Sequence, residues 1–251
     1  MRLRVTVAGL LAALLLTGCA QSVDPIERLG KKAAQRVRPQ ETAYRRWGLA
    51  APLAPAPHAP ARPAARTGGP GLPPVVDHVR TRDKVVFLTY DDGAERDPRF
   101  VDMVRELRLP VSMFLTDTVV GPGYAHFARL RAVGASVQNH TLDRASLRGL
   151  PYAGQRAEIC GQQEKLRQRF GVRPRLLRPP YGRYDATTLR AAAHCGVSAV
   201  VLGRTPDATQ PLRPGDILAG FDEPDLTDAT LRLLRRVQAE GFTPARLENY
   251  L

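Results

Sequence analysis

The sequence is short of acidic residues, because 24 Asp and Glu stand against 37 Lys and Arg, a formal net charge of +13. Aromatic residues make up only 6%. No stretch of residues 76–251 interleaves aromatic with basic side chains, as a groove for single-stranded nucleic acid does. The apolar run at residues 5–16 is shorter than the roughly 20 residues that a transmembrane helix needs. These shortages argue against nucleic-acid binding and against a spanning helix at the N-terminus.

Cysteine is also scarce, with three residues in the chain. Cys19 belongs to an N-terminal segment described below, which leaves Cys160 on one expected helix and Cys195 at the end of another. In an exported chain these two can form a disulfide between neighbouring helices. Two small buried thiols are the alternative, and the sequence leaves both open.

Residues 1–18 have the pattern of an export signal. Arg2 and Arg4 precede the apolar run, which ends in Leu-Thr-Gly-Cys at residues 16–19. Small residues just before a cysteine resemble the lipobox of bacterial lipoproteins. The resemblance implies cleavage after residue 18, lipidation of Cys19 and anchoring at the outer face of the bacterial cell membrane. An ordinary signal peptide with a chance cysteine is the alternative.

The excess positive charge belongs mainly to the first 75 residues, which hold 11 basic and three acidic side chains. Residues 51–75 contain eight prolines, mixed with alanine and glycine. Such a composition forms an extended, semi-stiff spacer and no packed core. We therefore expect residues 19–75 to be a basic, Pro/Ala-rich tether attracted to anionic lipid headgroups or wall polymers, and residues 76–251 to be the folded domain.

Strand-like and helix-like segments alternate from residue 76 onward. Expected strands lie at residues 84–90, 111–115, 135–138, 175–177, 198–202, 217–219 and, more weakly, 242–247. Expected helices lie at residues 98–107, 124–133, 153–170, 185–194 and 225–240, with start signals at Asp97, Asp185 and Asp225 or Thr227. Strands separated by helices predict an α/β fold with a parallel sheet, open or closed into a barrel. Functional residues then gather at the carboxyl ends of the strands.

Polar side chains follow three of these strands. Asp91 and Asp92 end the first, whose β-branched and aliphatic run predicts burial on both faces, and Gly93 would permit the turn. His140 and Arg178 follow the third and fourth. A carboxylate and an imidazole suit a divalent metal such as zinc, and an arginine can orient a second carboxylate. The plain alternatives are an acidic helix cap, a structural histidine and a simple ion pair.

Three segments carry a family resemblance: Thr-Tyr-Asp-Asp-Gly at 89–93, Asn-His-Thr at 139–141 and Arg-Pro-Pro-Tyr-Gly at 178–182. They resemble the first three motifs of the NodB-type polysaccharide deacetylases, carbohydrate esterase family four. The similarity spans roughly residues 80–251 and implies a distorted (β/α) barrel of about seven parallel strands. It also implies metal-dependent removal of acetyl groups from N-acetylglucosamine polymers such as peptidoglycan or chitin, or from acetylated xylan.

The resemblance also implies a role for each matching residue. Asp91 corresponds to the general base, Arg178 to the residue that tunes it, and Asp92 and His140 to metal ligands. Tyr181 corresponds to the tyrosine whose backbone N–H stabilises the oxyanion. An active enzyme of this kind would use a divalent metal such as zinc to polarise the carbonyl and supply the attacking water.

The sequence departs from the family pattern at two site positions. Arg144 stands where the second metal-binding histidine belongs, and Phe221 stands where the histidine acting as general acid belongs. The family's aspartate–tryptophan pair near the fifth strand is not evident at residues 202–207 either. Two protein ligands bind zinc more weakly than three, and the cation at Arg144 would repel a metal. Arg144 could instead pair with Asp92 and replace the metal's charge.

Two functions follow from these departures. The first is a divergent, metal-assisted deacetylase that hydrolyses the acetamide C–N bond of an N-acetylated cell-wall or related glycan. The second is a glycan-binding or scaffolding protein on the same barrel, with no need for a metal. The departures favour binding, whereas the retained Asp91, Asp92, His140 and Arg178 favour activity.

Overall fold

The computed structural model describes residues 43–58, 71–92, 97–207, 209–219 and 225–251. Within them, seven parallel strands form one sheet in the order β1-β6-β5-β4-β3-β2-β7, and β8 pairs with the start of β2. All seven predicted strands are present, and Val75–Val76 adds one that the sequence did not predict. The strands are β1 (Val75–Val76), β2 (Val85–Asp91), β3 (Val111–Leu115), β4 (Ser136–Asn139), β5 (Leu176–Leu177), β6 (Ala199–Val201), β7 (Asp216–Leu218) and β8 (Thr243–Pro244).

The five predicted helices are also present, and their starts follow from capping chemistry. Asp97 accepts a hydrogen bond from the Arg99 N–H, and the Asp185 and Asp225 carboxylates each accept one from an N–H in the first turn of their helix. The helices are α2 (Pro98–Leu107), α3 (Asp117–Val120), α4 (Tyr124–Ala132), α5 (Tyr152–Phe170), α6 (Ala186–His194) and α7 (Leu226–Ala239), with 3-10 turns η1 (Gly121–Gly123), η2 (Pro180–Gly182) and η3 (Leu247–Asn249). The single turn of α3 was not predicted. None of the described helices is long and apolar enough to cross a membrane.

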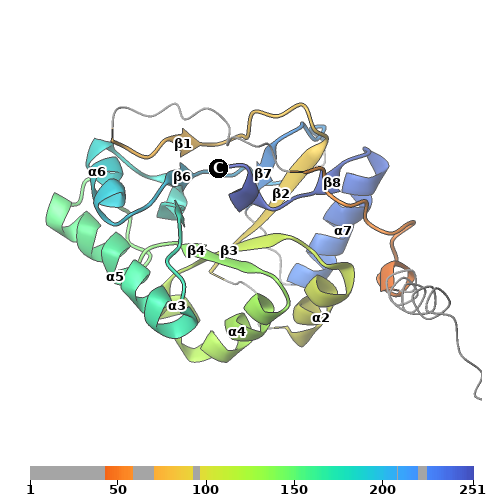
Figure 1. Ribbon diagram of the computed structural model, residues 1–251, viewed down its shortest axis with the longest axis horizontal. Helices are drawn as coiled ribbons and strands as arrows, with labels where there is room; N and C mark the ends of the chain where they lie inside the picture. The colour runs from red at the N-terminus through yellow and green to blue at the C-terminus, as the bar shows by residue number, and fades with distance from the viewer. Residues whose placement is uncertain (1–42, 59–70, 93–96, 208, 220–224) are drawn as a thin grey trace, which may run out of the picture. The chain divides into compact units, whose positions relative to one another are not determined.

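The sheet curls until its two sides approach each other. Arg204, just after β6, forms a parallel bridge to Leu218 of β7, in which its N–H donates to the Ile217 carbonyl at 2.9 Å. Helices α2, α4 and α5 lie along the outside of the curled sheet (Figure 1). The distorted (β/α) barrel predicted from the motifs is therefore confirmed.

Side chains along β2 alternate between a face packed on the helices and a face turned toward the other strands. The second face is apolar at the start of the strand and polar at its carboxyl end, the mouth of the barrel. Val86, Leu88 and Tyr90 belong to the apolar cluster that also contains residues of α2 and α7. Val85 and Phe87 belong to a second cluster with Phe114, Leu176 and Ile217 from other strands. Because side chains alternate along a strand, Thr89 and Asp91 continue the second set toward the carboxyl end.

Part of the predicted tether packs on the domain. Residues 43–46 are helical, and Ala43, Tyr44, Trp47 and Leu49 are buried in the cluster around α2 and α7. The Trp47 indole N–H donates to Glu106 Oε2 at 2.9 Å, and the Gly48 carbonyl accepts from Arg235 Nε at 3.0 Å. The proline content of residues 51–75 therefore marks an extended chain, yet the aromatic residues before it supply apolar surface to the core.

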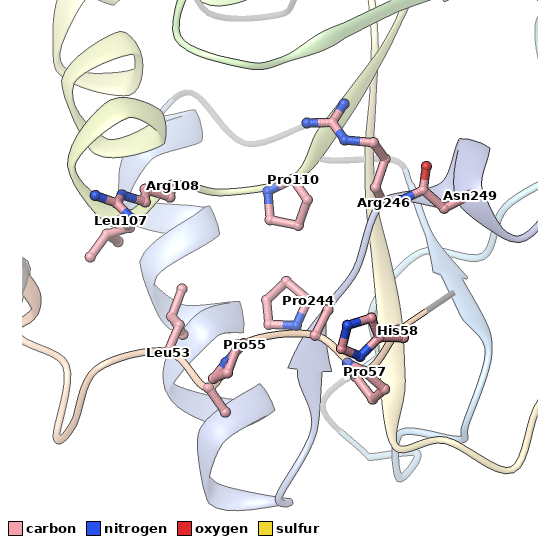
Figure 2. A pocket seen from close by; sticks show the side chains of 12 residues that line it. Leu53, Pro55, Pro57, His58, Leu107, Arg108, Pro110, Pro244, Arg246 and Asn249 are labelled. Carbon is pink, nitrogen blue, oxygen red and sulfur yellow. The ribbon is translucent and has the colours of Figure 1, made fainter. Parts of the chain in front are cut away.

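Residues 53–58 continue along the domain and line one side of a cavity of about 530 Å³. Figure 2 shows Pro55 and Pro57 on this segment, with Pro110 and Pro244 nearby from the loop before β3 and from β8. We call residues 43–58 the N-terminal strap. The remainder of the predicted tether that the structure describes, residues 71–75, leads into β1.

Candidate active site

Arg178 organises the mouth of the barrel from its position just after β5. Its Nη1 lies 2.6 Å from Asp91 Oδ1, and its Nη2 donates to Thr89 Oγ1 at 2.8 Å. The Thr89 hydroxyl donates onward to the Leu218 carbonyl at 2.7 Å, so β2, β5 and β7 are joined by one polar chain. The Arg178 side chain is 5% exposed and that of Asp91 is 29% exposed. Asp91 is thus held in one orientation while remaining open to the mouth.

Two residues that were not predicted from the sequence, Phe114 and Gly203, fix the position of the Arg178 guanidinium. Its carbon lies 4.1 Å from the centroid of the Phe114 ring, a cation–π contact. The absence of a side chain at Gly203 provides the space for the guanidinium, since a Cβ there would lie 3.2 Å from Arg178 Nη2 and 2.6 Å from the Ala219 Cβ. Any side chain at 203 would push against the guanidinium and β7.

Asp92 turns the chain out of the barrel. Its φ is 52°, in the left-handed region that aspartate tolerates better than most residues. Its N–H donates to the Phe114 carbonyl at 2.7 Å, and its Oδ1 accepts from the Thr116 N–H at 3.1 Å. Gly93, to which the sequence assigns the turn, lies outside the described residues. These contacts hold the Asp92 carboxylate, 7% exposed, inside the mouth.

His140 comes to the same point from the end of β4. Its Nδ1 lies 2.8 Å from the Arg178 carbonyl oxygen, which can only accept, so this nitrogen carries the proton. In the neutral imidazole the lone pair is then on Nε2, which lies 4.0 Å from Asp92 Oδ2. A backbone carbonyl fixes the tautomer of metal-binding histidines in this way. The described structure thus brings Asp91, Asp92, His140 and Arg178 together, as predicted.

Arg144 completes the group. Its Nε lies 3.0 Å from Asp92 Oδ2, so the pairing that the sequence suggested is present. The Arg144 side chain is 47% exposed, and its guanidinium carbon lies 5.9 Å from the centroid of the Tyr181 ring. Arg144 also adopts a left-handed φ of 59°. The second carboxylate oxygen of Asp92 therefore faces a fixed cation.

The residues present do not fit the metal that the family implies. Asp92 Oδ2 and His140 Nε2 are suitable donors, but the third direction is filled by Arg144, a cation without a lone pair. Among the described residues no group of three or more His, Cys, Asp or Glu side chains is placed to hold a metal ion. Zinc sites with a catalytic role use three protein ligands.

Of the other predicted site residues, Tyr181 borders this cluster, and the rest lie apart from it or outside the described residues. Tyr181 sits in η2 with φ 60° and a 68% exposed side chain beside Arg144, and the oxyanion role of its N–H stays a prediction. Phe221 and Cys19 belong to stretches that the structure does not describe. Cys160 and Cys195 form a disulfide that joins α5 to the end of α6, which decides between the two possibilities left open.

A curled parallel sheet with charged groups at the carboxyl ends of its strands defines a (β/α) barrel protein whose site lies where barrel enzymes place theirs. Residues 78–200 match the polysaccharide deacetylase family. The chain is 61% identical over 215 residues to an uncharacterized protein of Streptomyces coelicolor, covering 77% of this chain and 86% of that protein. It is 29% identical to a chitooligosaccharide deacetylase of a Bradyrhizobium strain, over 62% of this chain and 86% of that protein.

Solved structures agree on the fold. A family 4 carbohydrate esterase from Bacillus anthracis superposes with a TM-score of 0.63 at 19% identity, covering 78% of this chain and 98% of that one. A family 4 pseudoenzyme from the same organism gives a TM-score of 0.64 at 15% identity, over 71% and 69% of the two chains. The chain belongs to the NodB-type polysaccharide deacetylases, carbohydrate esterase family four, as its motifs predicted.

Proposed function

We propose that this member of the family binds an N-acetylated glycan at the barrel mouth and does not deacetylate it by the metal-assisted route. The observation that carries the proposal is the 3.0 Å contact between Arg144 Nε and Asp92 Oδ2. It places a guanidinium beside the carboxylate that would otherwise bind the metal. The same contact neutralises the Asp92 carboxylate, which is 7% exposed, so its charge is balanced without a metal ion.

The mouth offers the mixed surface that sugars need. The Tyr181 ring is 68% exposed and can pack against the apolar face of a pyranose. Asp91, 29% exposed and oriented by Arg178, can accept hydrogen bonds from hydroxyl or amide groups. Relatives and structural neighbours include deacetylases named for chitooligosaccharide, chitin and peptidoglycan. We therefore propose peptidoglycan, a chitin-like or a xylan-like polymer as the ligand.

A divergent deacetylase is the second candidate, and one observation favours it. Asp91 is oriented by Arg178 at 2.6 Å and stays open to the mouth, the arrangement that a general base needs. In this alternative Asp91 takes a proton from the water that attacks the acetamide carbonyl. The C–N bond of the acetamide then breaks as its nitrogen takes a proton from water or another side chain, releasing acetate and an amino sugar.

Binding and acetate release measured on the same samples separate the two candidates. We expect the purified protein to bind chitooligosaccharides or peptidoglycan fragments and to release no acetate with zinc or other divalent cations. Tyr181→Ala should weaken binding about tenfold, or about 1.4 kcal/mol, whereas Tyr152→Ala, on the exposed start of α5, should leave it unchanged. Acetate release that Asp91→Asn abolishes would establish the second candidate. Absence of binding to any of these glycans would refute the proposal.

We also propose that the protein is exported and lipid-anchored through Cys19. The disulfide between Cys160 and Cys195 supports export, because such bonds persist in oxidising compartments. Mass spectrometry of the protein from bacterial membranes should find an acylated N-terminal cysteine at position 19. A mature chain that begins elsewhere, without lipid, would contradict the anchor.

A further inference from the structure

One carboxylate oxygen of Asp92 is balanced by an ion pair and not by a hydrogen bond. Oδ2 is buried and has no hydrogen-bond partner, although Arg144 Nε lies 3.0 Å away in an ion-pair contact. A buried carboxylate oxygen without a hydrogen bond is costly unless a charge compensates it. The compensation here comes from a residue whose own side chain is 47% exposed. Asp92 therefore depends on Arg144 more than Arg144 depends on Asp92.

The second polar atom at this point is His140 Nε2. In the neutral imidazole of His140, Nε2 carries the lone pair, because Nδ1 donates to the Arg178 carbonyl at 2.8 Å. It faces Asp92 Oδ2 across 4.0 Å. Asp92 Oδ2 and His140 Nε2, the two potential metal ligands, therefore lie close together, and the Arg144 guanidinium lies beside them.

Two hydrogen bonds hold the backbone that leads to Arg144. The Thr141 N–H donates to Asn139 Oδ1 at 2.8 Å, and the Asp143 N–H donates to Glu158 Oε2 at 3.0 Å. Arg144 itself has a φ of 59°, a conformation in which histidine is found several-fold more often than most residues. A histidine at this position can therefore follow the existing chain path.

We propose that Arg144 is an internal cation that replaces a metal ion, and that this one residue decides whether the mouth takes zinc. The substitution Arg144→His would remove the repelling charge and add an imidazole to Asp92 and His140, giving the three protein ligands of a zinc site. This inference concerns the ion alone and holds whether or not the mouth binds a glycan.

Zinc binding of four proteins tests the proposal: the wild type, R144H, R148H and the double variant R144H/D92N. Arg148 is a matched control, because it is exposed and lies four residues along the same loop. After equilibrium dialysis against zinc, R144H should hold one zinc per chain, and the other three should hold no stoichiometric zinc. Added zinc should raise the melting temperature of R144H alone, and a chelator should reverse the rise.

Two results would overturn the proposal. One is stoichiometric zinc in the wild type that is lost in D92N, since Arg144 would then not exclude the ion. The other is a folded R144H, shown by circular dichroism, that binds zinc no more tightly than R148H.

A second measurement covers an R144H variant that does not fold. Arg144→Gln leaves a buried carboxylate without its cation, whereas Asp92→Asn leaves a half-exposed guanidinium in water. If Arg144 is the internal cation, Arg144→Gln lowers the melting temperature more than Asp92→Asn does. The reverse order would refute the proposal.

Discussion

The barrel mouth and the N-terminal strap bury very different side chains. At the mouth, Asp92, His140 and Arg178 are each less than 10% exposed, while the strap buries Tyr44, Trp47 and Leu49. The mouth also holds four of the five described non-glycine residues with positive φ: Asp92, Thr141, Arg144 and Tyr181. Each of these conformations costs roughly 1–2 kcal/mol in free energy. The backbone of the mouth therefore costs free energy of folding, whereas the buried side chains of the strap contribute to it.

The largest expected effect tests the strap side of the comparison. Trp47→Ala removes a buried indole from the cluster around α2 and α7, together with its hydrogen bond to Glu106. We expect the free energy of unfolding to fall by about 3–5 kcal/mol, measured by denaturant titration. Arg46→Ala is the matched control, because the neighbouring Arg46 side chain is 66% exposed and its pair with Glu106 contributes at most about 1 kcal/mol. A loss below about 1 kcal/mol for Trp47→Ala would show that the strap is not part of the core.

An intermediate effect tests the mouth. Thr89→Val keeps the shape of the side chain but leaves Arg178 Nη2 and the Leu218 carbonyl without their shared partner. We expect a loss of about 1–3 kcal/mol in the free energy of unfolding, because both groups are buried. Thr118→Val, at an exposed position on α3, should change it by less than about 0.5 kcal/mol. Equal effects of the two substitutions would show that the Thr89 hydroxyl does not help to hold Arg178.

The smallest effect concerns the support of the mouth loops by Asp185, which caps α6 and accepts from the Gly149 N–H at 3.1 Å. Burial opposes its ionisation, but the N–H groups of Gly149 and Thr188 outweigh it and lower the pKa of Asp185 to about 2. Because the folded pKa lies below the unfolded one, the stabilisation is present above about pH 4 and is lost as the pH falls toward 2. Asp185→Ala should cost about 1 kcal/mol at pH 7.

Melting temperatures between pH 5 and pH 2 check the origin of this effect. Asp185→Asn keeps an oxygen that can accept at the cap but does not titrate. Its stability should therefore fall less than that of the wild type over the acid range. Parallel curves for the two proteins would assign the acid sensitivity to other carboxylates.

The strands and helices of the domain followed from local signals. The β-branched run of β2 is buried at six of its seven residues, and the aspartate caps at 97, 185 and 225 begin their helices as predicted. The short β1 and α3 carry too little periodicity to be predicted. The packing of the strap is not predicted, because the burial of Tyr44 and Trp47 depends on contacts with distant helices.

The sequence alone determined which residue types meet at the mouth, because strand order places Asp91, Asp92, His140 and Arg178 at the same ends of parallel strands. The tertiary structure decided between the alternatives that the sequence left open: Arg144 pairs with Asp92, and Arg178 holds both Asp91 and Thr89. It also decided that Cys160 and Cys195 are joined. Pairing depends on distances of a few ångströms between segments far apart in the chain, and local composition carries no information on such distances.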